Sequence, residues 1–296
     1  MNLFKYENKK QKNYFEGWYF KWTDKESKHS YALIFAITKD VNDSHSFIQF
    51  YDASINKSFY YRYDSSEFKF DRESNKVHIK QNSISEDMIY FNESGYEISI
   101  DQSNHQRLNE YQKTNSAMGF LSKAPLECFQ EVLYLESDVI YTMNGKKCNA
   151  IGYMEKTYGT NFPSKWIWLQ SNHSEEKSKV SFSVGLVPVL FFKVKGFFLI
   201  LNYQGKEERF GSFNLSRIKV KKIDDKYSLT IKKGSTRVNI IAKSNTHTTL
   251  IGPRKKGIMD LEVFESLDST ASIKVFKKGK LVFEDNYSHV GLELMY

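Results

Sequence analysis

The sequence has few of the residues that build disulfide frameworks and metal centres. It contains two cysteines among 296 residues, Cys128 and Cys148, and no CxxC pair, so the usual zinc and redox motifs are excluded. We expect two free thiols, with a Cys128–Cys148 disulfide as the alternative. The seven histidines are scattered, without an HxH or HExxH pair, and we therefore predict no metal site.

Motifs for nucleotides and for activated serines are missing too. The chain has no GxSxG, no GxxxxGK followed by Ser or Thr, and no GxGxxG. These absences argue against a standard serine hydrolase, a P-loop protein and a dinucleotide enzyme. Proline is also scarce, with four residues, and a hydrophobic content of 40% can support a packed core, so the composition excludes a disordered chain.

Long apolar runs are lacking. The most apolar stretch, Val184–Leu201, carries two lysines, a proline and two glycines, whereas a membrane helix needs ~20 mostly apolar residues. We predict instead a pair of buried strands joined near Lys195 and Gly196. The first 13 residues contain no apolar run with a cleavage site, so we expect no secretory signal and a cytoplasmic protein.

The charge balance is moderately basic, with a formal net charge of +8. Such a charge fits either attraction to an anionic surface or an ordinary lysine-rich surface. Because the basic residues are spread along the chain and no nucleic-acid motif occurs, we predict no nucleic-acid partner. A weak association with anionic membrane surfaces stays open, and the sequence indicates no oligomeric state.

Aromatic residues are abundant, with 23 Phe and 19 Tyr, and they favour strands. Short alternating segments lie between turn signals, which is typical of antiparallel sheets. Tyr14–Trp22, Ser30–Thr38 and Ser46–Ala53 are the first of about eight strands expected before Asp101. The polar piece Gln102–Ser116 is weakly patterned and predicts a linker or surface loop.

Hairpin signals continue to the end of the chain, beginning with the Asn144-Gly145 pair. Many short strands at regular spacing suggest sandwiches or barrels, and two barrels suit this length better than one. We therefore predict an all-β protein with little helix, built from two antiparallel β-barrel domains packed together. We place the domains at residues 1–122 and 123–296, and strands that cross this boundary would move it.

The first motif, YFEGWYFK, covers Tyr14–Lys21 and sets a carboxylate among aromatic rings. In a strand, Tyr14, Glu16, Trp18 and Phe20 share one face. Burial disfavours a charged carboxylate, so Glu16 is a candidate general acid that is neutral near pH 7. The alternative is a structural Glu16 that pairs with Lys or Arg or accepts from backbone N–H groups.

The second motif, GYMEKTYGTNFPSKWIWLQSN, covers Gly152–Asn172 and holds a comparable carboxylate, Glu155. Its second half places Trp166, Trp168, Gln170 and Asn172 on one face. Two indoles followed by two amides resemble a ligand surface with an apolar end and a polar end. A buried tryptophan corner with satisfied amides is the structural alternative.

The two motifs, in this order and separation, resemble the tocopherol cyclase-like family. Ala117–Phe129 and the closing VGLELM at Val290–Met295 are also similar to that family. The resemblance implies paired lipocalin-like (calycin-like) barrels. Plant and cyanobacterial members close the chroman ring of tocopherols without a cofactor, by protonating a prenyl double bond that a phenolic hydroxyl then attacks. Where typical members have Asn or Asp followed by Trp after Glu-Lys, this chain has Thr157 and Tyr158.

The resemblance therefore implies a cofactor-free site for a hydrophobic small molecule, either a prenyl quinol, another isoprenoid or a lipid. Glu16 and Glu155 are the predicted acids. The predicted substrate-binding residues are Trp18, Tyr19, Lys156, Trp166, Trp168, Gln170 and Asn172. Three hypotheses stay open: an enzyme that protonates a prenyl C=C bond, a lipid- or isoprenoid-binding protein without chemistry, and a structural protein with filled barrels.

Overall fold

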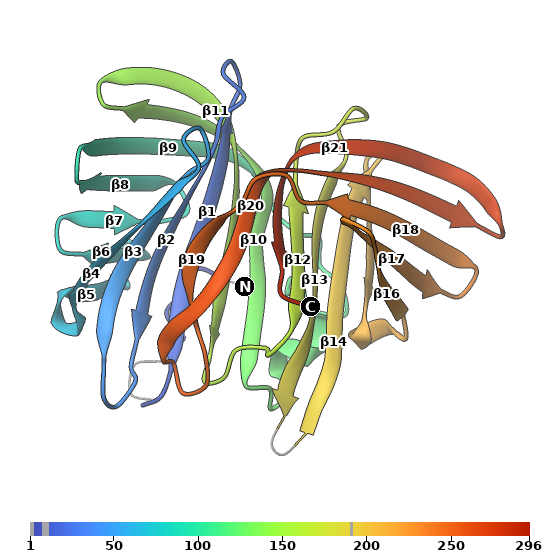
Figure 1. Ribbon diagram of the computed structural model, residues 1–296, viewed down its shortest axis with the longest axis horizontal. Coiled ribbons are helices and arrows are strands. Elements are labelled where there is room, and N and C mark those ends of the chain that lie inside the picture. The colour runs from blue at the N-terminus through green and yellow to red at the C-terminus, as the bar shows by residue number, and fades with distance from the viewer. Residues whose placement is uncertain (1–2, 8–11, 190–191) are drawn as a thin grey trace.

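Antiparallel strands cover most of the computed structural model, which describes residues 3–7, 12–189 and 192–296 (Figure 1). The strands form two sheets that lie side by side, the first coloured blue to green and the second yellow-green to red. Three short 3-10 helices are the helical elements among the described residues, η1 (Ser65–Glu67), η2 (Gly119–Lys123) and η3 (Ser212–Asn214). The all-β prediction with little helix is confirmed.

The first sheet has eleven strands in the order β4-β3-β2-β1-β11-β10-β9-β8-β7-β6-β5. Successive strands pair with each other, except β4 with β5, and the first strand pairs with the last, so the sheet curls into a nearly closed barrel. Its strands are β1 (Phe15–Asp24), β2 (Ser30–Thr38), β3 (His45–Asp52), β4 (Lys57–Asp64), β5 (Phe68–Asp71), β6 (Lys76–Ile79), β7 (Asn82–Ile84), β8 (Met88–Glu93), β9 (Tyr96–Gln106), β10 (Cys128–Met143) and β11 (Lys146–Gly159).

The second sheet has ten strands and repeats this plan, because its first strand, β12, pairs with its last, β21. Along this sheet the order is β15-β14-β13-β12-β21-β20-β18-β17-β16, and β19 pairs with β20. Its strands are β12 (Trp166–Ser171), β13 (Lys179–Val189), β14 (Phe192–Tyr203), β15 (Lys206–Gly211), β16 (Arg217–Ile223), β17 (Lys226–Lys233), β18 (Thr236–Lys243), β19 (Thr248–Pro253), β20 (Met259–Lys277) and β21 (Lys280–Leu294).

Three apolar clusters pack the molecule. One fills the interior of the first sheet around Trp18, Trp22 and Phe50, and a second fills the interior of the second sheet. The third lies between the sheets and contains Tyr19 and Trp168. Because β1 contributes to the first and third clusters through alternate residues, both of its faces are buried, which explains its aromatic content on each face.

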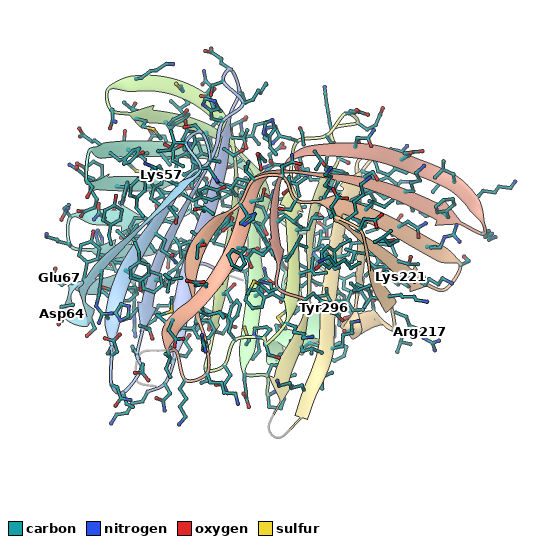
Figure 2. The ribbon with its side chains drawn as sticks, in the orientation of Figure 1. Lys57, Asp64, Glu67, Arg217, Lys221 and Tyr296 are labelled. Carbon is teal, nitrogen blue, oxygen red and sulfur yellow. The ribbon has the colours of Figure 1, made fainter. Side chains whose placement is uncertain are left out.

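Charged residues lie at the outer margins of both sheets. Figure 2 shows Asp64 and Glu67 at the far side of the first sheet and Arg217 and Lys221 at the far side of the second. Arg217 and Lys221 belong to β16, which ends the second sheet, and lysines on an edge strand oppose pairing with another chain. The basic sequence of this strand therefore fits a solvated edge.

The sheets divide the chain at a different place from the predicted domains. β10 and β11 belong to the first sheet, so the division falls between Gly159 and Trp166 instead of at residues 122 and 123. The physical reason is the pairing of β11 with β1, which joins a late segment of the sequence to the first strand. The polar piece after β9 is irregular, as the pattern indicates, but it connects two strands of one sheet.

Two further expectations differ in detail from the structure. The short strand β7 (Asn82–Ile84) was not expected, because three residues show no alternation. The apolar pair β13 and β14 is present, but Leu186 pairs with Lys195 and Gly185 with Gly196, so the predicted joint lies inside β14. Both cysteines are free, as predicted. No helix among the described residues is long and apolar enough to cross a membrane.

Gly152 on β11 tests the packing inside the first sheet. A Cβ atom there would lie 2.5 Å from Ser137 Oγ and 2.9 Å from both Phe20 and Val139. We expect Gly152→Ala to lower the free energy of unfolding by about 1–3 kcal/mol, because the neighbours must shift. Urea titration measures this loss. Gly196→Ala is the matched control, since its Cβ would come no closer than 3.3 Å to Val187, and an equal loss there would contradict the packing argument.

Candidate functional site

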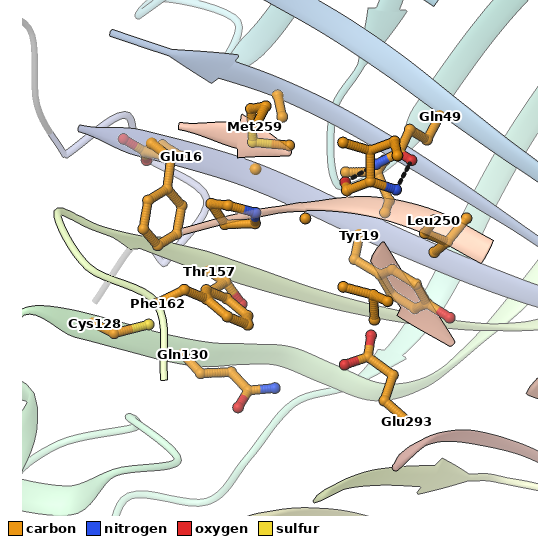
Figure 3. Close-up of a pocket in the computed structure, with 18 of the residues that line it drawn as sticks. Glu16, Tyr19, Gln49, Cys128, Gln130, Thr157, Phe162, Leu250, Met259 and Glu293 are labelled. Carbon is orange, nitrogen blue, oxygen red and sulfur yellow. Dashed lines mark hydrogen bonds between the residues drawn. The ribbon is translucent and has the colours of Figure 1, made fainter. Parts of the chain in front are cut away.

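A pocket of about 160 Å³ lies between the two sheets (Figure 3). β1, β2, β3, β10 and β11 form one wall, and β12, β19, β20 and β21 form the other. Most of the wall is apolar, and the polar side chains that line it include Tyr19, Gln49, Gln130, Glu155 and Glu293. The pocket therefore combines an apolar surface with three glutamates, Glu155, Glu293 and, at one end, Glu16.

Strand register places these groups opposite one another. Tyr19 on β1 pairs with Glu155 on β11, and Trp168 on β12 pairs with Glu293 on β21. Glu293 also pairs with Glu265 on β20. Paired residues project on the same face of a sheet, so both sheets present carboxyl and aromatic side chains to the space between them.

Gly291 explains how the indole of Trp168 fits against β21. A Cβ atom at this position would lie 2.8 Å from the Trp168 ring. The glycine of the closing VGLELM segment thus leaves room for the ring. Glu293, two residues later, projects from the same face of β21 beside it.

Glu155 is the best-bonded carboxyl of the site. It accepts from the Tyr153 hydroxyl at 2.6 Å, from Gln130 Nε2 at 2.9 Å and from Trp168 Nε1 at 3.0 Å. Burial raises its pKa above the ordinary value, and the three hydrogen bonds oppose that rise. Because all three bonds favour the charged form, Glu155 is better suited to hold a carboxylate than to donate a proton.

Glu293 is held by fewer donors. Trp166 Nε1 donates to it, and its pKa is raised to about 7, chiefly by burial and also by the charge of Glu155. Glu265, fully buried behind it, accepts from the Tyr19 hydroxyl at 2.6 Å. The pKa of Glu265 is raised well above its usual range, first by burial and then by the charge of Glu293. Two facing carboxyls of this kind are not both ionised near pH 7.

A buried lysine completes the polar cluster. Lys21 projects from β1 on the same face as Tyr19, and 2% of its surface is exposed. Its Nζ donates to Gln170 Oε1 at 3.1 Å and to the backbone oxygen of His289. Burial lowers the pKa of Lys21 to about 7. Gln170 thus serves as a partner of Lys21, behind the pocket wall.

Glu16 points to the opposite face of the same strand. Its carboxylate accepts from the Tyr14 hydroxyl at 2.7 Å and from the backbone N–H of Glu7 at 3.1 and 3.2 Å, and it lies 3.3 Å from Lys156 Nζ. Although Glu16 borders one end of the pocket, Figure 3 shows its carboxylate at the margin. These contacts match the alternative in which Glu16 has a structural role, paired with a lysine and bonded to backbone N–H groups. Burial also raises the pKa of Glu16.

Trp18 and Lys156 lie on this inner face as well. The Trp18 indole donates to the backbone oxygen of Phe4 at 3.0 Å, and Lys156 Nζ donates to the backbone oxygen of Lys5 at 2.7 Å. Together with Glu16 they fix residues 3–7 against the first sheet. Neither side chain lines the pocket between the sheets.

The predicted residues therefore separate into groups. Tyr19, Glu155, Trp166 and Trp168 line the pocket together. Asn172 donates to the backbone oxygen of Gly152 at 2.9 Å and so ties the end of β12 to β11. The carboxyls of the second sheet, Glu265 and Glu293, were missed in the sequence. Their signal is a carboxyl among apolar residues on strands, and Glu293 lies inside the quoted VGLELM segment.

Candidate cofactor ligands are sparse at this site. No group of three or more His, Cys, Asp or Glu side chains with metal-binding geometry occurs among residues 3–7, 12–189 and 192–296. The pocket contains neither a glycine-rich phosphate loop nor a helix N-terminus. The carboxyl groups of the pocket can give protons to an apolar ligand and accept protons from it.

Comparison with known families gives the assignment. A family model described as tocopherol cyclase-like matches residues 139–294, more than half of the chain. The chain belongs to the tocopherol cyclase-like family. The matched part contains Glu155, the second motif, Glu265 and Glu293, whereas YFEGWYFK lies outside it. No curated protein matches the sequence significantly.

Solved structures share the fold at low sequence identity. A protein described as AttH from Nitrosomonas europaea has a TM-score of 0.53 and 12% identity, with 94% of this chain and 91% of that chain covered. Kievitone hydratase from Nectria haematococca has a TM-score of 0.54 and 10% identity, with 94% and 88% covered. CghA with Sch210972 has a TM-score of 0.56 and 9% identity, with 95% and 88% covered. These likenesses support the lipocalin-like fold of this tocopherol cyclase-like protein.

Glu293 makes the stability of the fold depend on pH. In the unfolded chain it loses its proton near its ordinary pKa of 4.5, whereas the folded protein holds the proton up to about pH 7. Its contribution is fully present below pH 4.5 and is lost as the pH rises to about 7. We expect Glu293→Gln to be more stable than the wild type at pH 8 by on the order of 2 kcal/mol, and to lose this advantage at pH 4.

Urea unfolding between pH 4 and 8 measures this difference. Glu284→Gln, on the same strand but exposed and paired with Lys274, should leave the pH profile unchanged. A constant difference between the Glu293→Gln and wild-type proteins across this range would show that Glu293 titrates normally in the folded protein.

Proposed function

We propose that this tocopherol cyclase-like protein binds an unsaturated hydrophobic ligand between its two sheets and adds a proton to a C=C bond of that ligand. The observation that carries the proposal is Glu293, a carboxyl with a pKa of about 7 that lines an apolar pocket beside two indoles. A general acid works best when its pKa lies near the working pH. The family supports the same type of chemistry.

Glu293 is the acid in this proposal. Its proton passes to one alkene carbon, and the other carbon becomes a cation while Glu293 becomes a carboxylate. Trp166 and Trp168 line the pocket, and an aromatic ring attracts a nearby cation by ~0.5–2 kcal/mol. The new carboxylate of Glu293 attracts the cation further, and this attraction is strong because opposite charges interact more strongly away from water.

Glu155 is the base. An oxygen nucleophile, either a hydroxyl of the same ligand or a water molecule, attacks the cation and loses its proton to the Glu155 carboxylate. The three donors that hold Glu155 orient it and favour its carboxylate form, against the effect of burial. The proton balance closes when the proton on Glu155 is released and Glu293 is protonated again. Thr157 lines the pocket near Glu155, but its hydroxyl is too weak an acid to replace Glu293.

The size of the pocket limits which part of the ligand reacts there. Sites that enclose a drug-sized ligand have volumes of ~300–1,000 Å³. A cavity of about 160 Å³ therefore takes the reacting end of a prenyl chain or one ring. The rest of a longer ligand must extend out of the pocket. On one side of the pocket, β19 is held against the first sheet by two bonds of 2.8 Å between Gln49 and the Ile251 backbone.

The two nucleophiles give different products. Attack by a hydroxyl of the ligand closes a ring and leaves the mass unchanged, whereas attack by water adds the mass of water. One of the structures with a similar fold is named a hydratase, so both products belong in the assay. Prenylated quinols and isoprenoid alkenes form a suitable panel, with products identified by mass spectrometry.

Glu293→Gln tests the acid. Glutamine keeps the size and the acceptor for Trp166 but cannot donate a proton to carbon, so we expect turnover to fall by ~10²–10⁴-fold. Glu284→Gln on the same strand should keep full activity. If Glu293→Gln keeps its activity and Glu16→Gln loses it, the acid is Glu16, on the inner face of the first sheet. A co-purified ligand without turnover over the whole panel would contradict catalysis and indicate a binding protein.

A further inference from the structure

A second concavity lies on the other side of the polar cluster. It is a groove of about 900 Å³ that involves β10, β11, β17, β18, β20 and β21, and His173 and His289 line it. The two imidazole rings lie 5.2 Å apart. Four exposed lysines, Lys28, Lys177, Lys226 and Lys243, line the groove with them. The groove is therefore wide, polar and basic, in contrast to the apolar pocket.

Lys21 and Glu265 lie between the groove and the pocket and line neither of them. On the pocket side, Glu265 accepts from Tyr19 at 2.6 Å and stands opposite Glu293 in the pairing of β20 with β21. On the groove side, Lys21 donates to the backbone of His289. The two buried residues also interact through their charges, because Lys21 lowers the pKa of Glu265. Titratable groups thus occupy the wall between the two cavities, with Glu265 toward the pocket and Lys21 toward the groove.

We propose that Lys21 and Glu265 carry protons from the groove to Glu293, so that the acid is recharged while the ligand fills the pocket. This inference rests on the proposed function, since it takes Glu293 as the acid. Protonated Glu265 gives its proton to the Glu293 carboxylate. The Lys21 ammonium then gives a proton to Glu265 and becomes a neutral amine, and water in the groove returns a proton to Lys21.

The bonding of the two residues leaves the positions that such transfer needs. An ammonium group has three N–H donors, and two of those on Lys21 are bonded to Gln170 and His289. Oε2 of Glu265 is buried and has no hydrogen-bond partner among the described residues. Leaving a buried polar atom unpaired costs free energy. A carboxyl with a purely structural role would not need to leave one of its oxygens unpaired.

The energies of the end points are also well matched. Lys21 and Glu293 both have a pKa of about 7, because burial disfavours the charged form of each. A proton can therefore move from one to the other with little change in free energy. The groups that face this route are Tyr19 from β1, Tyr51 from β3, Glu155 from β11, His173 after β12, Asp268 from β20 and His289 from β21.

Infrared titration of the full-length protein tests the route without any substrate. Neutral carboxyls absorb apart from carboxylates, so the pH at which the buried glutamates lose their protons can be followed directly. Lys21→Met removes the positive charge from the row, and we expect the midpoint of the Glu265 band to rise by about one to three pH units. Glu265→Gln removes that band and so identifies it as the band of Glu265.

Lys28→Met is the matched control, because Lys28 borders the groove but is exposed. Its titration should equal that of the wild type, and an equal midpoint in Lys21→Met would overturn the proposal. If Lys21→Met does not fold, Glu265→Gln decides through turnover, and a kcat equal to that of the wild type overturns the proposal.

Turnover measurements distinguish a role of Lys21 in proton transfer from a purely electrostatic role. Lys21→Arg keeps a positive charge that is not lost near pH 7, so it should restore the infrared midpoint but still lower kcat at least about tenfold with KM unchanged. Equal kcat values in Lys21→Arg and the wild type would overturn the transfer role. If no substrate turns over in the wild type, the proposed function fails, and the route is then rejected even where the infrared shifts appear.

Discussion

The packing of β1 and β11 against β12 and β21 removes three glutamates from water, and the chemistry of the site depends on this desolvation. Alone, each sheet would leave Glu155, Glu265 and Glu293 in contact with solvent, with ordinary acidity. The two sheets together hold them among Tyr19, Trp166 and Trp168. The pKa values of these carboxyls are thereby raised above those of exposed carboxyls, so the groups can exchange protons near neutral pH.

One strand separates two kinds of carboxyl chemistry. On β1, Glu16 and Trp18 face the interior of the first sheet, where Lys156 and the segment of residues 3–7 engage them. Tyr19 and Lys21 face the second sheet. Because side chains alternate along a strand, neighbouring residues of one motif serve different surfaces. A structural anchor and a reactive site are thus encoded in the same eight residues.

Much of the fold could be predicted from the sequence, because alternation is a local signal. Strand faces followed the alternation at Glu16 and Trp18 and again at Trp166 and Trp168. The division between the sheets could not be found in this way, since the pairing of β1 with β11 joins residues about 140 positions apart. Glu155 was identified from its motif, but Glu265 and Glu293 become recognisable only when register places them opposite each other.

Lys21 is a single residue whose environment could not be predicted from the sequence. In the sequence it is the last polar residue of an aromatic motif, and a lysine at a strand end normally reaches solvent. The structure buries it because β20 and β21 cover the strand from the other sheet. The pKa of Lys21 is lowered because these strands bury it, and no local sequence pattern predicts that burial.

The connection between the sheets has a consequence for how relatives can diverge. Residues 160–165 join β11 to β12, and Phe162 and Pro163 within this connection form part of the pocket wall. The Phe162 ring packs edge-on against Phe15 and Trp166, one residue from each sheet. Because Phe162 and Pro163 lie outside the strands, substitutions there change the shape offered to a ligand and leave the pairing of the twenty-one described strands in place. New ligand preferences can therefore evolve at these two positions.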